Sequence, residues 1–311
     1  MDSIKEISVI VPVYNGARAL SELVTRIVDV LEKIKISYEI IIVDDFSTDN
    51  SWDVLVEIQQ KYIDVSIIRL SKNFGQHNAT VCGISESSGN TIITLDDDLE
   101  HPPEFIEELY THFVEGGYDL YYAIPKNRQK NIIRNFISEL WYFSTKISKK
   151  GIGKATSYRV MKKKLAQCLI QHREPFVYIE SILHWYTENI GYLEVEFDKR
   201  KYGNSNYSIL SLFTLNHDIG MHYDTHILKF MKNFGAIVFF ASMALIFRFL
   251  IRKIYGHVIP GYTSIIIVLL FSTGTLFWGM GYLGLYIGKM FRILNKEPQF
   301  QITEKKTSRK K

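Results

Sequence analysis

Residues 91–104 read "TIITLDDDLEHPPE", a short apolar run followed at once by three aspartates. The run that ends at Leu95 has the length and the β-branched content of a buried strand. Three adjacent carboxylates at the end of such a strand are unfavourable, because like charges repel and burial penalises an unpaired ion. We therefore expect a positively charged partner to bind at Asp96, Asp97 and Asp98.

Three earlier stretches repeat this pattern of an apolar run that ends at polar residues. Helix-like segments follow the runs, among them an amphipathic stretch that reaches about Lys33. Continuous apolar runs of this length, separated by helices, indicate parallel strands that are covered on both faces. Successive units of this kind predict a doubly wound α/β sheet with right-handed connections. The expected strands are residues 7–13, 38–45, 65–70 and 91–95.

The polar clusters at the strand ends are expected to meet in one crevice with the acidic triplet. In open α/β sheets, ligands bind at the carboxyl ends of the parallel strands. Tyr14 and Asn15 follow the first strand, and Asp44 and Asp45 end the second. Carboxylates in this position can accept hydrogen bonds from a base or a ribose.

The acidic triplet itself predicts a metal site. Asp96 and Asp98 point to the same side of an extended chain, because side chains alternate along a strand. Glu100 continues the alternation and offers a third oxygen, whereas Asp97 is expected to point away. Such oxygens suit a hard divalent cation, Mg²⁺ or Mn²⁺, that also binds substrate phosphates. Alternatively, one aspartate caps the helix that begins near Pro102.

Two apolar blocks occupy the last third of the sequence. Residues 234–251 contain a single charge, Arg248, and residues 261–288 contain none. At roughly 1.5 Å per residue, a helix over each block approaches or exceeds a hydrocarbon core about 30 Å thick. We expect two membrane-spanning helices, with flanking basic residues that place both chain ends in the cytoplasm. Residues 209–233 fit an amphipathic helix on the bilayer surface or simply a packed helix.

The net charge of +4 is concentrated at the C-terminal end. The last sixteen residues hold six basic and two acidic side chains, so the rest of the chain is neutral. This distribution argues against a nucleic-acid binder, whose basic residues spread over a folded face. A basic tail beside an apolar block fits the cytoplasmic face of a membrane, and it equally fits a solubilising tail. Two cysteines without a CxxC pair, and an N-terminus without signal-peptide features, favour a reducing compartment.

Seven stretches form an ordered series of motifs. In chain order they are "VPVYNG", "IIIVDDFSTDNS", "SKNFGQHNAT", "TLDDDLEHPPE", "SYRVMKKKL", "RKYGNSNYS" and "YLGLYIGKMFRILNKEPQF". The series resembles that of family 2 glycosyltransferases with a GT-A fold, and it covers nearly the whole chain. It is most similar to the polyprenyl-phosphate branch, which includes dolichol-phosphate mannose synthase and bacterial undecaprenyl-phosphate transferases of glucose or formamido-arabinose. By contrast, there is no GxxxxGK[ST], GxGxxG, HExxH or GxSxG motif, as many ATPases, dinucleotide enzymes, zincins and serine hydrolases have.

The resemblance implies a GT-A nucleotide-sugar-binding domain with a mostly parallel central sheet, followed by an amphipathic helix and two transmembrane helices. The implied parts are a catalytic domain over residues 1–208, an interfacial helix over 209–233, a two-helix anchor over 234–289 and a basic cytoplasmic tail over 290–311.

The resemblance also implies roles for particular residues. Positions lining the nucleotide pocket are matched by Pro12, Tyr14 and Asp44, and the D-x-D metal motif by Asp96 and Asp98, with Glu100 as a further metal ligand. Phosphate-handling positions are matched by Arg159, Arg200 and Ser205, with Arg128 and Arg134 as further candidates for a lipid phosphate. The residues implied to carry catalysis are Asp98, Arg159 and Arg200.

One departure from the family pattern concerns proton transfer. Relatives often carry an acidic residue just before the aromatic-arginine pair, where this chain has Ser157. A lipid phosphate has a second pKa near 6, so its oxygen is already an anionic nucleophile at neutral pH. Positioning and charge neutralisation can then suffice without a base.

The sequence thus predicts an inverting glycosyltransferase that uses Mg²⁺ or Mn²⁺. It is expected to move a sugar from a nucleotide sugar, UDP-linked by resemblance, to undecaprenyl phosphate at the cytoplasmic membrane face, for cell-envelope glycans. Two alternatives stay open, a transferase that acts on a surface polysaccharide and a non-catalytic nucleotide-sugar binding protein. The lipid bilayer is the expected further partner, and Gly284 and Gly288 at small-xxx-small spacing leave homo-oligomers open.

Overall fold

The computed structural model describes residues 5–126, 155–172, 174, 177–198, 234, 237, 244, 247, 251 and 262–307. The chain divides into two compact units. One comprises Met1–Asn206 together with Pro298–Lys311, and the other comprises Tyr207–Glu297.

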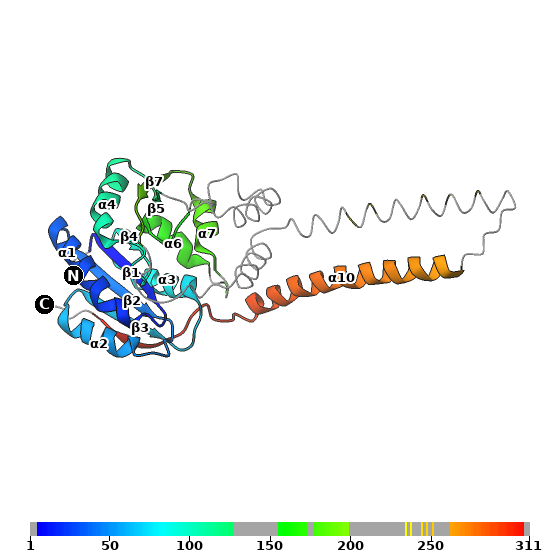
Figure 1. Ribbon diagram of the computed structural model, residues 1–311, viewed down its shortest axis with the longest axis horizontal. Helices are drawn as coiled ribbons and strands as arrows, with labels where there is room; N and C mark the ends of the chain where they lie inside the picture. Colours follow the sequence, from blue (N-terminus) through cyan, green and yellow to red (C-terminus); the bar gives the residue numbers. More distant parts are fainter. Residues whose placement is uncertain are drawn as a thin grey trace. The chain divides into compact units, whose positions relative to one another are not determined.

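The first unit is built on a single eight-stranded sheet (Figure 1). Its strand order is β7-β5-β6-β4-β1-β2-β3-β8. The strands are β1 (Ile7–Val13), β2 (Tyr38–Asp44), β3 (Val65–Leu70), β4 (Thr91–Thr94), β5 (Leu120–Pro125), β6 (Arg159–Lys162), β7 (Ile190–Val195) and β8 (Ile302–Lys306).

The four strands expected from the sequence are confirmed, and they form the centre of the sheet. β1 pairs in parallel with β2 and β4, and β2 pairs in parallel with β3. All seven residues of β1 are buried, which explains why its sequence is apolar throughout rather than alternating. The carboxyl ends of β1, β2 and β4 therefore lie side by side, as the crevice requires.

Helices cover both faces of the sheet. The helices α1 (Ala17–Ile34), α2 (Ser51–Lys61) and α4 (Ile106–Glu115) pack on one face, where α1 contacts both others. The helices α3 (Gln76–Ser85), α6 (Lys163–Gln171) and α7 (Ile179–Tyr186) pack on the other face (Figure 1). A single 3-10 turn, η1 (Pro103–Phe105), leads into α4 near the position expected for a helix start.

The other half of the sheet brings β6 to the edge of the crevice. β6 runs antiparallel to β4, and Arg159 lies opposite Thr94 in this pairing. β6 also pairs antiparallel with β5, and β5 pairs in parallel with β7. The sheet is thus mostly parallel, with an antiparallel insertion next to the acidic triplet.

The C-terminal end differs from the expected tail. β8 lies within the range 290–311 and runs antiparallel to β3, so it forms an edge of the sheet. Lys305 forms an ion pair with Glu86, the residue that follows α3, and Lys306 lies 5.8 Å from the ring centroid of Trp52 in α2. The basic residues that suggested a solvated tail are therefore partly used for edge-strand contacts, which charge alone does not reveal.

In the second unit, α10 (Tyr262–Leu294) is one helix of 33 residues. It contains most of the second apolar block, and many of its apolar side chains are exposed, such as Leu276 and Ile287. Within the described part of the chain, no helix meets the combined length and hydropathy of a membrane-crossing segment. The two expected crossings are therefore not confirmed. The expected interfacial helix over 209–233 lies outside the described residues.

Candidate active site

Asn15 joins the loops that follow β1 and β2. It adopts a left-handed backbone conformation with φ of 57°, which asparagine tolerates better than most residues. Its side-chain oxygen accepts hydrogen bonds from the backbone N–H groups of Thr48 and Asp49, and its own N–H donates to Ser47 Oγ. The two loops are thereby held as one wall of the crevice, with the Tyr14 side chain exposed beside them.

Asp44 ends β2 as a fully buried carboxylate. Burial raises its pKa, while the hydrogen bond from Ser47 and the charge of Arg69 act in the opposite direction. Asp44 Oδ2 lies 3.3 Å from Arg69 Nε, yet neither atom makes a hydrogen bond within the described residues. The two groups form an ion pair, and because neither completes a hydrogen bond in it, the pair can still offer an acceptor and a donor to a base edge that carries both groups.

Asp45 has a different role from the one expected. Its two carboxylate oxygens accept hydrogen bonds of 2.7 and 2.8 Å from the backbone N–H groups of Phe74 and Gly75. Burial raises the pKa of Asp45 to about 6, although both hydrogen bonds act to lower it. Asp45 therefore fixes the loop between β3 and α3, and does not face the crevice as a ligand.

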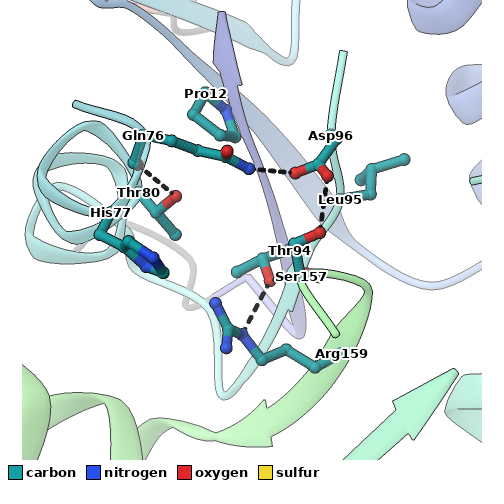
Figure 2. A pocket seen from close by; sticks show the side chains of 9 residues that line it. All are labelled: Pro12, Gln76, His77, Thr80, Thr94, Leu95, Asp96, Ser157 and Arg159. Atoms are coloured by element: carbon teal, nitrogen blue, oxygen red, sulfur yellow. Dashed lines mark hydrogen bonds between the residues drawn. The ribbon is translucent and has the colours of Figure 1, made fainter. Parts of the chain in front are cut away.

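Asp96 lies in a small pocket at the end of β4 (Figure 2). One of its oxygens accepts a hydrogen bond from Gln76 Nε2 at 2.5 Å, and the other accepts one from Ser157 Oγ at 2.6 Å. Two neutral donors thus orient the carboxylate. The pocket is lined by Pro12, Gln76, His77, Thr80, Thr94, Leu95, Asp96, Ser157 and Arg159.

Asp97 turns towards the loop after β1. Its Oδ2 accepts the N–H of Tyr14 at 3.3 Å. A Cβ atom at Gly16 would lie only 3.1 Å from the Cγ of this carboxylate, so any other residue there would force the Asp97 side chain to shift. Burial, and then the charges of Asp96 and Asp98, raise the pKa of Asp97 to about 7. The crowding of three carboxylates is thus real, and a bound cation would relieve it.

The third expected metal oxygen is not positioned as an extended chain would place it. β4 ends at Thr94, and Leu99 has a left-handed φ of 60°, so the alternation of side chains breaks before Glu100. Asp98 Oδ1 instead accepts the backbone N–H of Glu100 at 3.0 Å. Across the described residues, no three His, Cys, Asp or Glu side chains gather into a metal-binding group. Asp96 and Asp98 fit a cation that also takes water and phosphate oxygens.

Arg159 lines the pocket, but its charge is already paired with that of Glu180. Its side chain is buried, its Nη1 donates to Glu180 Oε1 at 2.9 Å, and its Nε donates to Thr94 Oγ1 at 3.2 Å. A guanidinium neutralised in this way is a poor partner for an incoming phosphate. The phosphate-binding role expected of Arg159 therefore does not match its contacts.

Four further expected site residues cannot be placed. Positions 128, 134, 200 and 205, which are Arg128, Arg134, Arg200 and Ser205, lie outside the described residues.

Comparison with known proteins identifies the family. The model of glycosyl transferase family 2 matches residues 8–172, more than half of the chain. The chain belongs to glycosyltransferase family 2. It is 30% identical over 309 residues to the undecaprenyl-phosphate 4-deoxy-4-formamido-L-arabinose transferase of Proteus mirabilis, covering 97% of this chain and 94% of that protein. It is also 30% identical to an uncharacterized glycosyltransferase of Synechocystis, covering 96% and 95%. These full-length likenesses support its place in the polyprenyl-phosphate branch.

Solved structures agree on the fold of this family 2 glycosyltransferase. Glucosyl-3-phosphoglycerate synthase of Mycobacterium tuberculosis, solved with Mn²⁺, UDP and phosphoglyceric acid, matches with a TM-score of 0.55 and 14% identity. The match covers 70% of this chain and 76% of that one. TarS of Staphylococcus aureus with UDP-GlcNAc matches with a TM-score of 0.51 and 16% identity, covering 70% and 67%.

Three residues of this glycosyltransferase were missed as individual candidates. Gln76 and His77 lie in the quoted motif "SKNFGQHNAT", but the motif gives no reason to separate them from their neighbours. Glu180 lies in no motif at all. Only the tertiary contact with Arg159 reveals it.

Proposed function

We propose that the protein transfers a sugar from a nucleotide sugar to a polyprenyl phosphate, with inversion, at the cytoplasmic face of the membrane. The observation that carries this proposal is the likeness over nearly the whole chain to a protein named as an undecaprenyl-phosphate transferase. Asp96, the first residue of the acidic triplet after a central strand, lines a pocket, and the triplet supplies the matching chemistry.

The donor is proposed to be a UDP-sugar. UDP or UDP-GlcNAc is bound in solved structures that share the fold. In this chain, the ion pair of Asp44 Oδ2 and Arg69 Nε at the end of β2 includes one acceptor and one donor that make no hydrogen bond within the described residues. Uracil carries an N–H group between two carbonyl oxygens, so it complements this pair, and the exposed Tyr14 ring offers a surface for stacking.

Asp96 and Asp98 are the residues that would hold Mg²⁺ or Mn²⁺. The metal, when bound, neutralises the diphosphate so that it can leave. Gln76 and Ser157 keep the Asp96 carboxylate oriented, and Asp97 holds the loop of Tyr14 against the acidic triplet. These residues therefore prepare the site before substrate binds.

A phosphate acceptor is consistent with the contacts of Ser157. The Ser157 hydroxyl donates to Asp96, so it is not arranged to remove a proton from an acceptor. A phosphate acceptor is already anionic near pH 7 and requires no such base. A hydroxyl acceptor, as on a polysaccharide, would require one.

A polyprenyl acceptor implies work at a bilayer. The apolar side chains exposed along α10, among them Phe291 and Leu294, support contact of the second unit with lipid. The basic residues that precede and follow the apolar blocks support the cytoplasmic side.

The proposal is tested with purified full-length protein, undecaprenyl phosphate, Mn²⁺ or Mg²⁺ and a panel of UDP- and GDP-sugars, scored by the mass of the lipid product. A lipid phosphate carrying one sugar supports the proposal and identifies the donor. Sugar incorporated only into a polysaccharide acceptor contradicts the lipid assignment. Binding of a nucleotide sugar without any product contradicts the enzymatic assignment.

A further inference from the structure

Three charged or titratable side chains from separate elements meet beside the pocket. Arg159 comes from β6, Glu180 from the first turn of α7 and His77 from the first turn of α3. Arg159 and Glu180 are buried, whereas the His77 side chain keeps 29% of its surface exposed. Nothing in the chemistry proposed above uses Glu180 or His77.

Arg159 fixes one oxygen of Glu180. The Arg159 Nη1 to Glu180 Oε1 distance is 2.9 Å, and Arg159 is itself held by Thr94 on the neighbouring strand. Burial alone would raise the pKa of Glu180, but the charge of Arg159, and that of His77 whenever it is protonated, bring the pKa below its ordinary value. Glu180 is therefore an anion whose position is set by the sheet.

The second oxygen of Glu180 faces His77. Glu180 Oε2 has no hydrogen-bond partner within the described residues, and it lies 3.9 Å from His77 Nδ1. A buried carboxylate oxygen without a partner is unfavourable, and a small rotation of the imidazole would give it the Nδ1–H donor. The Tyr178 ring packs edge-on against the imidazole, with the two ring centroids 5.1 Å apart. This contact limits rotation of the imidazole in other directions.

A hydrogen bond from His77 Nδ1 to Glu180 would leave Nε2 as the imidazole nitrogen available to the pocket. Burial lowers the pKa of His77, the charge of Glu180 opposes this, and Arg159 lowers it further, with a net value below the ordinary one. The imidazole is then neutral near pH 7, with its proton on Nδ1 and a free lone pair on Nε2. Figure 2 shows the ring extending from α3 into the pocket wall, across from Asp96 and Leu95.

We propose that Glu180 is a positioning residue that orients His77, and that His77 Nε2 accepts a hydrogen bond from a hydroxyl of the sugar being transferred. This inference rests on the proposed function, because it assumes a sugar in the pocket beside Asp96. It assigns a specificity-determining contact to a side chain outside the set that we assign to the nucleotide and the metal. Among the described residues that line the pocket, His77 is the only ionisable side chain apart from Asp96 and the paired Arg159.

The first test reads the tautomer directly, without any activity. Full-length protein labelled with ¹⁵N-histidine is compared with His77→Gln, which assigns the His77 signals, and with Glu180→Gln. The expected result at pH 7 is a neutral His77 protonated on Nδ1 in the unaltered protein, and loss of this preference in Glu180→Gln. A proton on Nε2, or no change in Glu180→Gln, would overturn the positioning role.

The second test compares UDP with UDP-glucose, UDP-galactose and UDP-GlcNAc as ligands in the presence of Mn²⁺. In His77→Ala, the affinity for the preferred UDP-sugar should fall about tenfold, the effect of one lost hydrogen bond, while the affinity for UDP stays unchanged. His77→Gln, which restores an acceptor, should recover part of the loss. His172→Gln, in a half-buried histidine outside the pocket, is the matched control.

Equal losses for UDP and UDP-sugar, or no loss for either, would overturn the sugar contact. Because Glu180→Gln leaves Arg159 without its partner, its thermal unfolding is measured first, and the sugar contact is judged on the His77 variants. If the unaltered protein makes no lipid product, the proposed function fails. The ¹⁵N spectrum still decides whether Glu180 orients His77, so the two failures are distinguishable.

Discussion

At the scale of single residues, adjacent aspartates of the acidic triplet are expected to respond differently to the same substitution. Asp98→Asn removes a carboxylate that we assign to the metal, so turnover should fall by at least about 10²-fold. Asp97→Asn keeps an acceptor for the Tyr14 N–H and should lose less than about tenfold. Initial rates across a Mn²⁺ titration measure both. Equal losses in the two variants would contradict the assignment of Asp98.

Ser157 offers a second prediction at this scale. Ser157→Asp places a carboxylate where the serine now donates a 2.6 Å hydrogen bond to Asp96. Repulsion between the two carboxylates should weaken metal binding and lower turnover at pH 7. Ser157→Ala, which only removes the hydrogen bond, is the matched control and should lose less. Initial rates for both decide, and a marked increase in Ser157→Asp would show that a base is needed after all.

Individual site residues were predictable only where their position follows from the strand pattern. Asp96 and Pro12 lie in the pocket because they end or occupy central strands, and the sequence shows those strands clearly. The contact of Asp97 with the Tyr14 N–H and the ion pair of Arg159 were not predictable, because both depend on contacts between distant segments. No spacing within "SYRVMKKKL" indicates that Glu180 is the ion-pair partner of Arg159.

At the scale of elements, the four central strands were predictable because burial on both faces demands continuous apolar runs. β8 was not predictable, because its sequence "ITEKK" is mostly polar and charged, and an edge strand of this kind shows little apolar pattern. Its pairing with β3 depends on a segment more than 200 residues away in the chain. The same charges that suggested a free tail protect this edge from pairing with other chains.

The ion pair between Lys305 and Glu86 provides a test of β8. Lys305→Glu should destabilise the first unit slightly, by less than about 1 kcal/mol, because the pair is partly exposed. Glu86→Lys alone should have a similar effect, and the double exchange should recover most of the loss. Thermal unfolding of the four proteins measures the coupling. Strict additivity of the two single effects would show that the pair does not hold β8 in solution.

At the scale of the whole molecule, the first unit includes both ends of the chain, and the segment Tyr207–Glu297 is inserted between β7 and β8. A polyprenyl chain does not leave the bilayer, so the acceptor that we propose would require the pocket beside Asp96 to work at the bilayer surface. We expect the inserted unit to provide this attachment through apolar contact, because its described helix exposes side chains such as Met290 and Phe291.

Apolar and electrostatic attachment respond differently to salt, which gives the last prediction. Charge attraction between basic residues and anionic lipid is screened within about 3 Å at 1 M salt, whereas burial of apolar side chains is not weakened. Full-length protein should therefore float with liposomes of neutral and of anionic lipid alike, at both 0.1 M and 1 M salt. Release at 1 M salt, or binding to anionic liposomes alone, would mean that the basic residues and not the inserted unit hold the enzyme at the membrane.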